Sequence, residues 1–234
     1  MSEAAPGLPD SPAFATPERA ELAASLRALI DAAMSVEDVA PEVLRDVAAE
    51  VRTLASRVGP SRVGGSGYRR NHGDYLPRSP VVGEASPLSP RLDWEMQRDG
   101  DDRVVIEGRG VFGAAYEGPP GYVHGGWIAC AFDEMLGIAN ITAGNPGMTA
   151  RLTVHYRRPT PLFEEVVFRA WTERIEGRRI MTRGELRSGG ELTCEAEGIF
   201  VPPRPELAEK YFGAPPGTGD APGTGPGTGD APAS

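Results

Sequence analysis

The sequence predicts an α+β domain in which one antiparallel sheet curls around a single buried helix. Three observations lead to this fold class. Residues 127–139 are apolar almost all round, six segments between residues 91 and 201 look like strands, and their order is two strands, the helix and four more strands. Because a helix that is apolar on every side has to be buried, the sheet is expected to wrap around it.

The first elements along the chain are predicted to be two helices. Thr16-Pro17-Glu18 is typical of an N-cap followed by proline, and a helix to about Met34 follows. Pro41 opens a second helix that runs to about Val58. Apolar residues recur at helical spacing in both, at Leu22, Leu26, Leu29 and Ile30 and at Val43, Val47, Val51, Leu54 and Val58. We expect a helical hairpin that packs on the domain or covers its site.

The strands are predicted in two groups. Residues 91–97 and 103–112 precede the buried helix, and residues 149–158, 164–175, 179–187 and 191–201 follow it as a meander. Ser188-Gly189-Gly190 predicts a hairpin turn between the last two. Segment 149–158 alternates, with Leu152, Val154 and Tyr156 on one face and Thr149, Arg151, Thr153, His155 and Arg157 on the other.

The composition divides the chain into five parts. Residues 1–16 and 204–234 are expected to be disordered, because they are rich in Gly, Pro, Ala, Ser and Thr and the second contains GTGDAP twice. Residues 17–58 form the helical extension, residues 59–84 a loop-rich linker, and residues 85–203 the domain with the wrapped sheet.

Charge and cysteine content exclude several classes of protein. A net charge of −9 argues against nucleic acid as the main partner, because no basic stripe is available to neutralise phosphates. No run of eighteen apolar residues and no secretory leader occur, so we expect a cytoplasmic protein without a membrane span. Cys130 and Cys194 lack CxxC spacing and no metal-ligand spacing occurs, so neither a disulfide framework nor a metal site is expected.

The residues that carry chemistry lie on the buried helix. His124-Gly125-Gly126 opens it, and Asp133-Glu134 interrupts its apolar surface. Glycines at a helix start let backbone N–H groups approach a ligand, and a carboxylate on a buried helix is costly unless it is paired or used. An N–H site and a carboxylate are the parts that an acyl-transfer or hydrolysis site needs.

Together with the strand Thr149–Pro159, these motifs resemble those of the hotdog-fold acyl-CoA thioesterases. The resemblance covers residues 85–203 and is to the phenylacetate-pathway (PaaI-type) bacterial enzymes and the animal thioesterase-superfamily-member proteins that carry the HGG motif. It implies a hotdog fold, hydrolysis of an acyl-CoA to free acid and CoA, and a role in fatty acid metabolism. It implies no cofactor beyond the coenzyme A of the substrate.

The resemblance also assigns roles to single residues. The backbone at Gly125 and Gly126, after His124, would form an oxyanion hole for the thioester carbonyl. Asp133 would be the general base or nucleophile, assisted by the Thr149 hydroxyl. The family implies active sites at the subunit interface of a homodimer or a dimer of dimers. His124 is expected to orient the loop rather than to transfer protons.

The sequence leaves other candidate site residues and other functions open. Glu134, about 100° further round the helix, is the alternative base, and Asp133 could instead form a structural pair with Arg151. Arg157 and Arg158 suit the phosphates of coenzyme A, and Trp127 could line the acyl pocket. A non-catalytic acyl-CoA-binding protein, as a sensor or scaffold, is the alternative to an enzyme. A dehydratase on the same fold fits less well, because glycines follow His124 directly.

Overall fold

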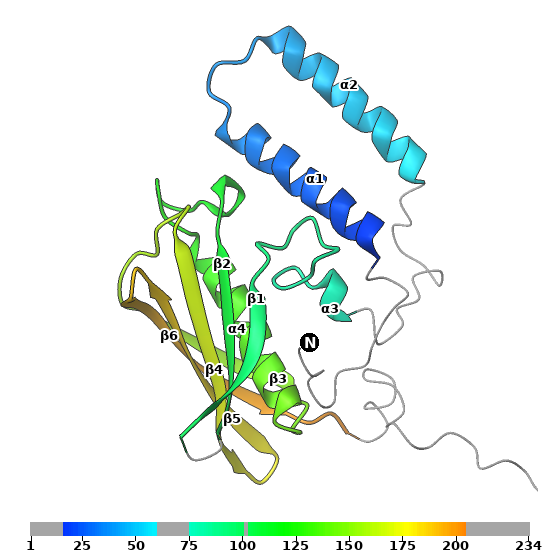
Figure 1. Cartoon of the computed structure of the whole chain (residues 1–234). Helices are drawn as coiled ribbons and strands as arrows, with labels where there is room; N and C mark the ends of the chain where they lie inside the picture. The colour runs from blue at the N-terminus through cyan, green and yellow to red at the C-terminus, as the bar shows by residue number, and fades with distance from the viewer. Residues whose placement is uncertain (1–15, 60–74, 101–102, 205–234) are drawn as a thin grey trace, which may run out of the picture. The chain divides into compact units, whose positions relative to one another are not determined.

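The computed structural model describes residues 16–59, 75–100 and 103–204. The termini predicted to be disordered lie outside these residues except for Thr16 and Arg204, and so does most of the 59–84 linker. Within the described residues the predicted fold class is confirmed. An antiparallel sheet wraps around a central helix, and two helices precede it, which is the hotdog arrangement with an N-terminal helical pair (Figure 1). No described helix combines the length and apolarity needed to cross a bilayer.

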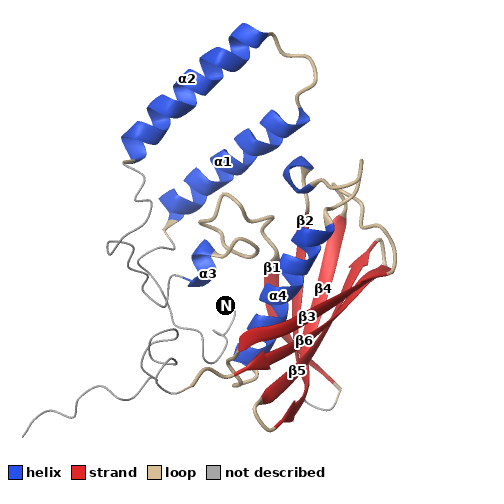
Figure 2. Ribbon diagram, turned by 180° about the vertical axis from the view of Figure 1, so that it is seen from behind, coloured by secondary structure: helices blue, strands red, loops and turns tan. Residues whose placement is uncertain are grey.

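The central helix is α4, Gly125–Thr142, and the sheet curves around it (Figure 2). Ten of its eighteen residues are buried, and Phe132, Met135 and Leu136 are fully enclosed. A half-buried stripe remains at Cys130, Asp133, Gly137 and Ile141, which helical spacing places on one side. The sheet, together with the core residues of segments 76–92 and 112–116, therefore covers α4 on all sides but one.

The sheet has six antiparallel strands in the order β1-β2-β4-β5-β6-β3. Their bounds are Asp93–Asp99, Arg103–Val111, Met148–Tyr156, Glu165–Glu176, Arg179–Ser188 and Glu191–Val201 for β1 to β6. The predicted meander of the last four strands is correct for β4, β5 and β6 but wrong for β3, which pairs with β6 and forms an edge. Strand β2, which precedes α4, pairs with β4, and strand β3, which follows α4, pairs with β6. Strands β2 and β3 therefore flank the β4–β5–β6 meander on its two sides.

Glycines on the inner face of the sheet let α4 approach closely. A Cβ on Gly184 of β5 would lie 3.1 Å from the ring of Phe132, and one on Gly198 of β6 would lie 3.1 Å from Leu136. The bulk that fills the interior therefore comes from the helix, and the sheet makes room for it.

The outer face of the sheet is covered with charges. Strand β4 alternates between buried Val166, Phe168 and Ala170 and outward residues that are partly exposed. Arg183 on β5 lies 2.7 Å from Glu173 and 3.5 Å from Glu197, and similar ion pairs continue across the neighbouring strands. Such exposed pairs contribute little stability each, but they mark this face as the one turned to water.

The predicted helical pair is present as α1, Pro17–Ser35, and α2, Pro41–Val58. The Thr16 hydroxyl caps α1 by accepting from the Arg19 N–H, as its position before proline predicts. Helix α1 contacts the domain: Ala23 is buried and Arg27 donates to the carbonyl oxygen of Ser86 at 2.7 Å. No residue of α2 is buried.

Residues 75–92, the described part of the chain between the helices and the sheet, are more ordered than a loop-rich linker implies. A short helix, α3, spans Tyr75–Arg78, and turns lie between residues 80 and 88. The Ser89 hydroxyl donates to the carbonyl oxygen of Val81 at 2.6 Å, and the Ser79 hydroxyl accepts from two backbone N–H groups. Side-chain hydrogen bonds of buried serines take the place of regular backbone hydrogen bonds in this segment. The sequence therefore shows no helix or strand periodicity there.

Replacing Gly184 by alanine tests the close approach of α4. The new methyl group would press on Phe132 and on the Arg169 carbonyl oxygen, both 3.1 Å away, so we expect the free energy of unfolding to fall by about 1–3 kcal/mol. The matched control is Glu185→Ala, the next residue on the outer face, which should stay within about 0.5 kcal/mol of the original protein. Equal denaturation midpoints for the two variants would contradict this account.

Candidate active site

The first turn of α4 presents one backbone donor. His124 is the N-cap, and its Nδ1 accepts from the Gly126 N–H at 2.9 Å while its carbonyl oxygen accepts from the Trp127 N–H at 2.9 Å. The hydrogen bonds among the described residues leave the Gly125 N–H without an acceptor. The oxyanion hole expected from Gly125 and Gly126 together reduces to Gly125, because the Gly126 N–H is occupied by the cap.

Tyr116 stabilises the turn before α4 through its backbone and its ring. The Tyr116 carbonyl oxygen accepts from the His124 N–H at 2.8 Å, and the Tyr116 ring meets Trp127 edge-on at 5.1 Å. Burial, with the nearby Asp31 charge, raises the pKa of Tyr116 to about 12, so its hydroxyl stays protonated and donates to the carbonyl oxygen of Leu88. Trp127, predicted to line an acyl pocket, is half-buried against this ring.

Tyr156 is a site residue that the sequence analysis missed. From the end of β3 its hydroxyl donates to the carbonyl oxygen of Gly125 at 2.7 Å, and its ring lies 3.3 Å from where a Cβ on Gly125 would be. Glycine at this position thus lets the ring close over the helix start. The signal was available, since Tyr156 shares the inward face of the alternating strand with Leu152 and Val154.

Asp133 is held by Thr149. The Thr149 hydroxyl donates to Asp133 Oδ1 at 2.7 Å, from the start of β3 to the half-buried stripe of α4. The pair lies where the sheet leaves α4 uncovered, so the carboxylate is oriented and remains accessible to water.

A β-bulge brings these two residues together. The pairing of β3 with β6 shifts between Thr149 and Arg151, so that Ala150 is skipped and Thr149 pairs with the inward-facing Phe200. Without the bulge, Thr149 would face outward with Arg151, as the strict alternation of the sequence predicted. That prediction was wrong for Thr149, and the alternative in which Asp133 pairs with Arg151 is replaced by the contact with Thr149.

The neighbours of Asp133 differ from it in access and charge. Glu134, the alternative base, is only 9% exposed and belongs to the buried side of α4. Cys130 lies one turn before Asp133, and burial followed by the charges of Glu134 and Asp133 raises the pKa of its thiol. A thiol kept protonated is a poor nucleophile, so the accessible group for chemistry on this stripe is Asp133.

Arg157 and Arg158 lie just beyond Tyr156, near the start of α4. Both are exposed, and they form ion pairs with Glu195 at 2.7 Å and Glu191 at 2.6 Å. Their backbone N–H groups donate to the carbonyl oxygen of Thr193. A phosphate could approach these guanidinium groups only by sharing them with the two carboxylates.

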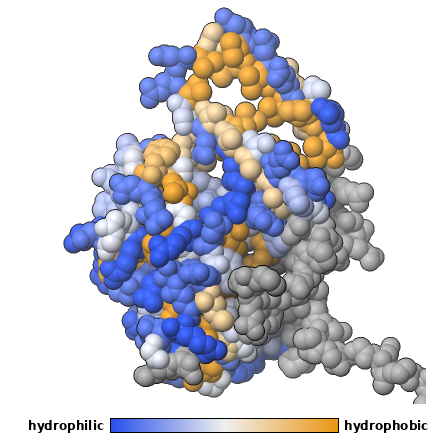
Figure 3. Space-filling model, viewed as in Figure 1, coloured by the Kyte–Doolittle hydropathy of each residue, from blue (hydrophilic) through white to orange (hydrophobic). Residues whose placement is uncertain are grey.

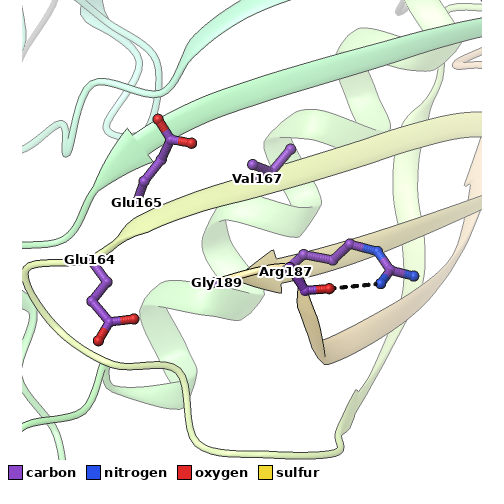
Figure 4. A pocket seen from close by; sticks show the side chains of 6 residues that line it. Glu164, Glu165, Val167, Arg187 and Gly189 are labelled. Atoms are coloured by element: carbon purple, nitrogen blue, oxygen red, sulfur yellow. Dashed lines mark hydrogen bonds between the residues drawn. The ribbon is translucent and has the colours of Figure 1, made fainter.

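An open pocket of about 460 Å³ lies away from these residues, lined by Glu164, Glu165, Val167, Arg187, Gly189 and Gly190 (Figure 4). Val167 and Arg187 are paired across β4 and β5 and point outward, while their neighbours Val166, Phe168 and Leu186 are buried toward α4. The pocket is therefore on the water-facing side of the sheet and contributes nothing to the Asp133 site. Among the described residues no three His, Cys, Asp or Glu side chains are gathered as a metal ion would require.

Known proteins to which this chain is similar include thioesterases. A family model described as thioesterase superfamily matches residues 120–195. The acyl-coenzyme A thioesterase THEM4 of Xenopus laevis is 40% identical over 91 residues, 38% of this chain and 41% of that protein. THEM4 of Mus musculus is 38% identical over 96 residues, 40% of this chain and 41% of that protein. The chain thus spans about two fifths of the length of the curated relatives it matches.

A solved structure matches over a longer stretch. A crystal structure described as a thioesterase superfamily protein has 30% identity and a TM-score of 0.69, covering 82% of this chain and 94% of its own. Residues 75–234 number 160 of 234, which is less than 82%, so the match includes part of the first 74 residues. The similarity therefore extends into the part of the chain that contains α1 and α2.

Deleting Ala150 tests the role of the bulge. Ala150 is the extra residue, so its loss should restore one-to-one pairing, with Thr149 directly before Arg151, still opposite Phe200 and still facing inward. A crystal structure of the deletion variant should show a regular β3–β6 ladder and the Thr149–Asp133 hydrogen bond kept. Thr149→Val is the control that loses the hydroxyl and keeps the bulge. The account is wrong if Thr149 turns away from Asp133 after the deletion.

Proposed function

The chain belongs to the thioesterase superfamily, and from that premise we propose that it hydrolyses an acyl-CoA thioester to a free acid and coenzyme A. The observation that carries the proposal is the 2.7 Å hydrogen bond from Thr149 to Asp133, on the one side of α4 that the sheet leaves open. A carboxylate that is accessible and fixed in direction can either activate a water or attack a carbonyl carbon.

The chemistry needs few groups. The oxygen of water, or of the Asp133 carboxylate, bonds to the thioester carbon; the carbon–sulfur bond then breaks and the thiolate of coenzyme A leaves. In the water route Asp133 takes the proton and returns it to the thiolate. In the direct route the acyl group stays on Asp133 as a mixed anhydride, which water then hydrolyses to release the free acid and restore the carboxylate. The Gly125 N–H would stabilise the charge on the carbonyl oxygen, a contribution of about 3 kcal/mol for one such donor. Because a thiolate leaves readily, no strong acid is required.

The distance between these groups supports a site shared by two copies of the chain. Gly125 and Asp133 are eight residues apart, which is about 12 Å along a helix. A carbonyl whose oxygen accepts from the donor and whose carbon is attacked spans only about 6 Å between the two groups. Direct attack by the Asp133 of the same chain would leave the Gly125 N–H out of reach. A second copy can place its own Asp133 opposite this Gly125.

Strand β3 offers the contact for such a homodimer. It is an edge of the sheet, seven of its nine residues are exposed, and it carries both Thr149 and Tyr156. Edge strands need pairing or cover. Pairing β3 with its copy would close the open side of α4 and bring the two half-sites together. Coenzyme A would then lie between the subunits, with its phosphates beside Arg157 and Arg158. The two guanidinium groups would bind the phosphates while keeping their ion pairs with Glu195 and Glu191.

Asp133→Asn is the direct test of catalysis. It keeps the shape of the side chain and removes the base, so kcat should fall by about 10²–10⁴-fold. Hydrolysis is measured with a thiol-reactive dye across acyl-CoA chain lengths, and Glu134→Gln is the matched control, expected to keep activity within a few-fold. A loss below about tenfold for Asp133→Asn refutes its role, and a severe loss for Glu134→Gln exchanges the two roles. Tight acyl-CoA binding without turnover in the unchanged protein would favour the sensor or scaffold.

A mixed dimer tests the shared site. Gly125→Pro removes the N–H; proline suits the first helical position, and His124 already has the extended backbone that proline requires before it. Each variant alone should be inactive. Co-expressed with an Asp133→Asn chain and purified through two different tags, the heterodimer should regain up to half of the original activity, because one of its two sites has both groups intact. An inactive heterodimer would mean that each chain builds its own site.

A further inference from the structure

The most apolar exposed surface of the described residues lies on α1 and α2. Eleven of the nineteen large apolar side chains that are exposed belong to these helices and the loop between them. Figure 3 shows the hydrophobic side chains gathered along both helices. Below, the helical-pair surface means these eleven residues: Leu22, Leu26, Leu29, Met34, Val36, Val43, Leu44, Val47, Val51, Leu54 and Val58.

Helix α1 has two faces, and the domain covers only one of them. Ala23 is buried, Arg27 donates to the Ser86 carbonyl oxygen, and Asp31 accepts from the Ala115 N–H at 3.4 Å, so positions four apart face the domain. Leu22, Leu26 and Leu29 are spaced by four and three residues on another face, and each stays at least 36% exposed. The contact with the domain thus leaves a complete apolar stripe on α1 uncovered.

Helix α2 has a stripe of the same kind and no buried residue. Leu44, Val47, Val51, Leu54 and Val58 follow the alternating spacing of three and four residues that is typical of helices packed side by side. Val43, Ala48 and Ala55 border this stripe, which widens the apolar arc to about 140° at 100° per residue. An arc wider than a simple seam is typical of a helix with more than one helical neighbour.

The charges beside the α2 stripe fit an antiparallel copy of the same helix. At 100° per residue, Glu50 and Arg57 lie along one border of the stripe, on either side of Val51 and Leu54. Two antiparallel α2 helices that meet near Val51 and Leu54 bring equal borders together, so Glu50 of each copy lies toward Arg57 of the other. In a parallel pairing this border would meet the opposite border of the partner, where Ala48 and Ala55 lie, and these charge pairs would not form.

We propose that the helical-pair surface binds the helical-pair surface of a second copy of this chain, with the two α2 helices antiparallel, in a bundle of four helices. Such a contact is self-complementary, as twofold interfaces require. In this register residues 47–58 of the two α2 helices overlap over about 18 Å, so the α1 stripes beside them are needed to reach a standard interface of about 800 Å² on each partner. The contact is separate from β3, so it does not depend on the proposed hydrolysis.

Opposite charges at one position test whether a second copy is the partner. Val51→Asp and Val51→Lys are made in the full chain, with Thr53→Asp, on the outer side of α2, as the matched control. Amide hydrogen exchange of residues 41–58 and sedimentation velocity are then measured. The unchanged protein and Thr53→Asp should show slow exchange in α2. Each Val51 variant alone should lose this protection by at least tenfold, because equal charges meet in the bundle.

Co-expression of the two Val51 variants, purified through two tags, decides the identity of the partner. The mixed protein should regain slow exchange in α2, since aspartate of one copy meets lysine of the other. Lack of recovery in the mixed protein overturns the proposal, and so does fast exchange of α2 in the unchanged protein. Protection that appears only with phosphatidylcholine vesicles assigns the surface to lipid and also overturns it. Asp133→Asn should leave all these measurements unchanged, so that failure of the bundle and failure of the catalytic proposal are told apart.

Discussion

The burial of α4 is the constraint on which the rest of the structure depends. A helix with so few polar side chains is unstable in water, and five of the six strands contact it directly. The sheet can close around it only because β5 and β6 place glycines against Phe132 and Leu136. The wrap is incomplete along one stripe, and there Asp133 and its partner Thr149 lie. The candidate site thus lies on the side of α4 that is left uncovered, where a carboxylate can stay in contact with water.

Much of this could be predicted from the sequence because the signals are local. Thr16-Pro17 and Pro41 mark the starts of α1 and α2, and the apolar run after His124-Gly125-Gly126 marks α4. The position of β3 beside β6 and the bulge at Ala150 could not be predicted, because both are set by pairing with a strand about fifty residues away. Alternation alone turned Thr149 outward. Tyr156 was on the correct face, but only the fold brings its hydroxyl to Gly125.

The N-terminal helix is connected to the start of α4 through a short series of contacts. Asp31 of α1 accepts from the N–H of Ala115, in the 3-10 helix η2, Ala114–Tyr116. The next residue, Tyr116, accepts from the His124 N–H and packs against Trp127. Gly113 leaves room for Asp31, since a Cβ there would lie 2.7 Å from the carboxylate. The loop that presents the Gly125 N–H is therefore supported by Tyr156 on one side and by η2, with α1 behind it, on the other.

The strand order also has a consequence for the way the chain folds. The pairs β1–β2, β4–β5 and β5–β6 join neighbours in sequence and can form early as hairpins. The pair β2–β4 closes a loop that contains all of α4, and β3–β6 closes another across the meander. Until both pairings have formed, the apolar surface of α4 stays exposed to water. We expect the exposure of apolar surface during folding to depend on the rate of these two distant pairings rather than on the stability of the finished fold.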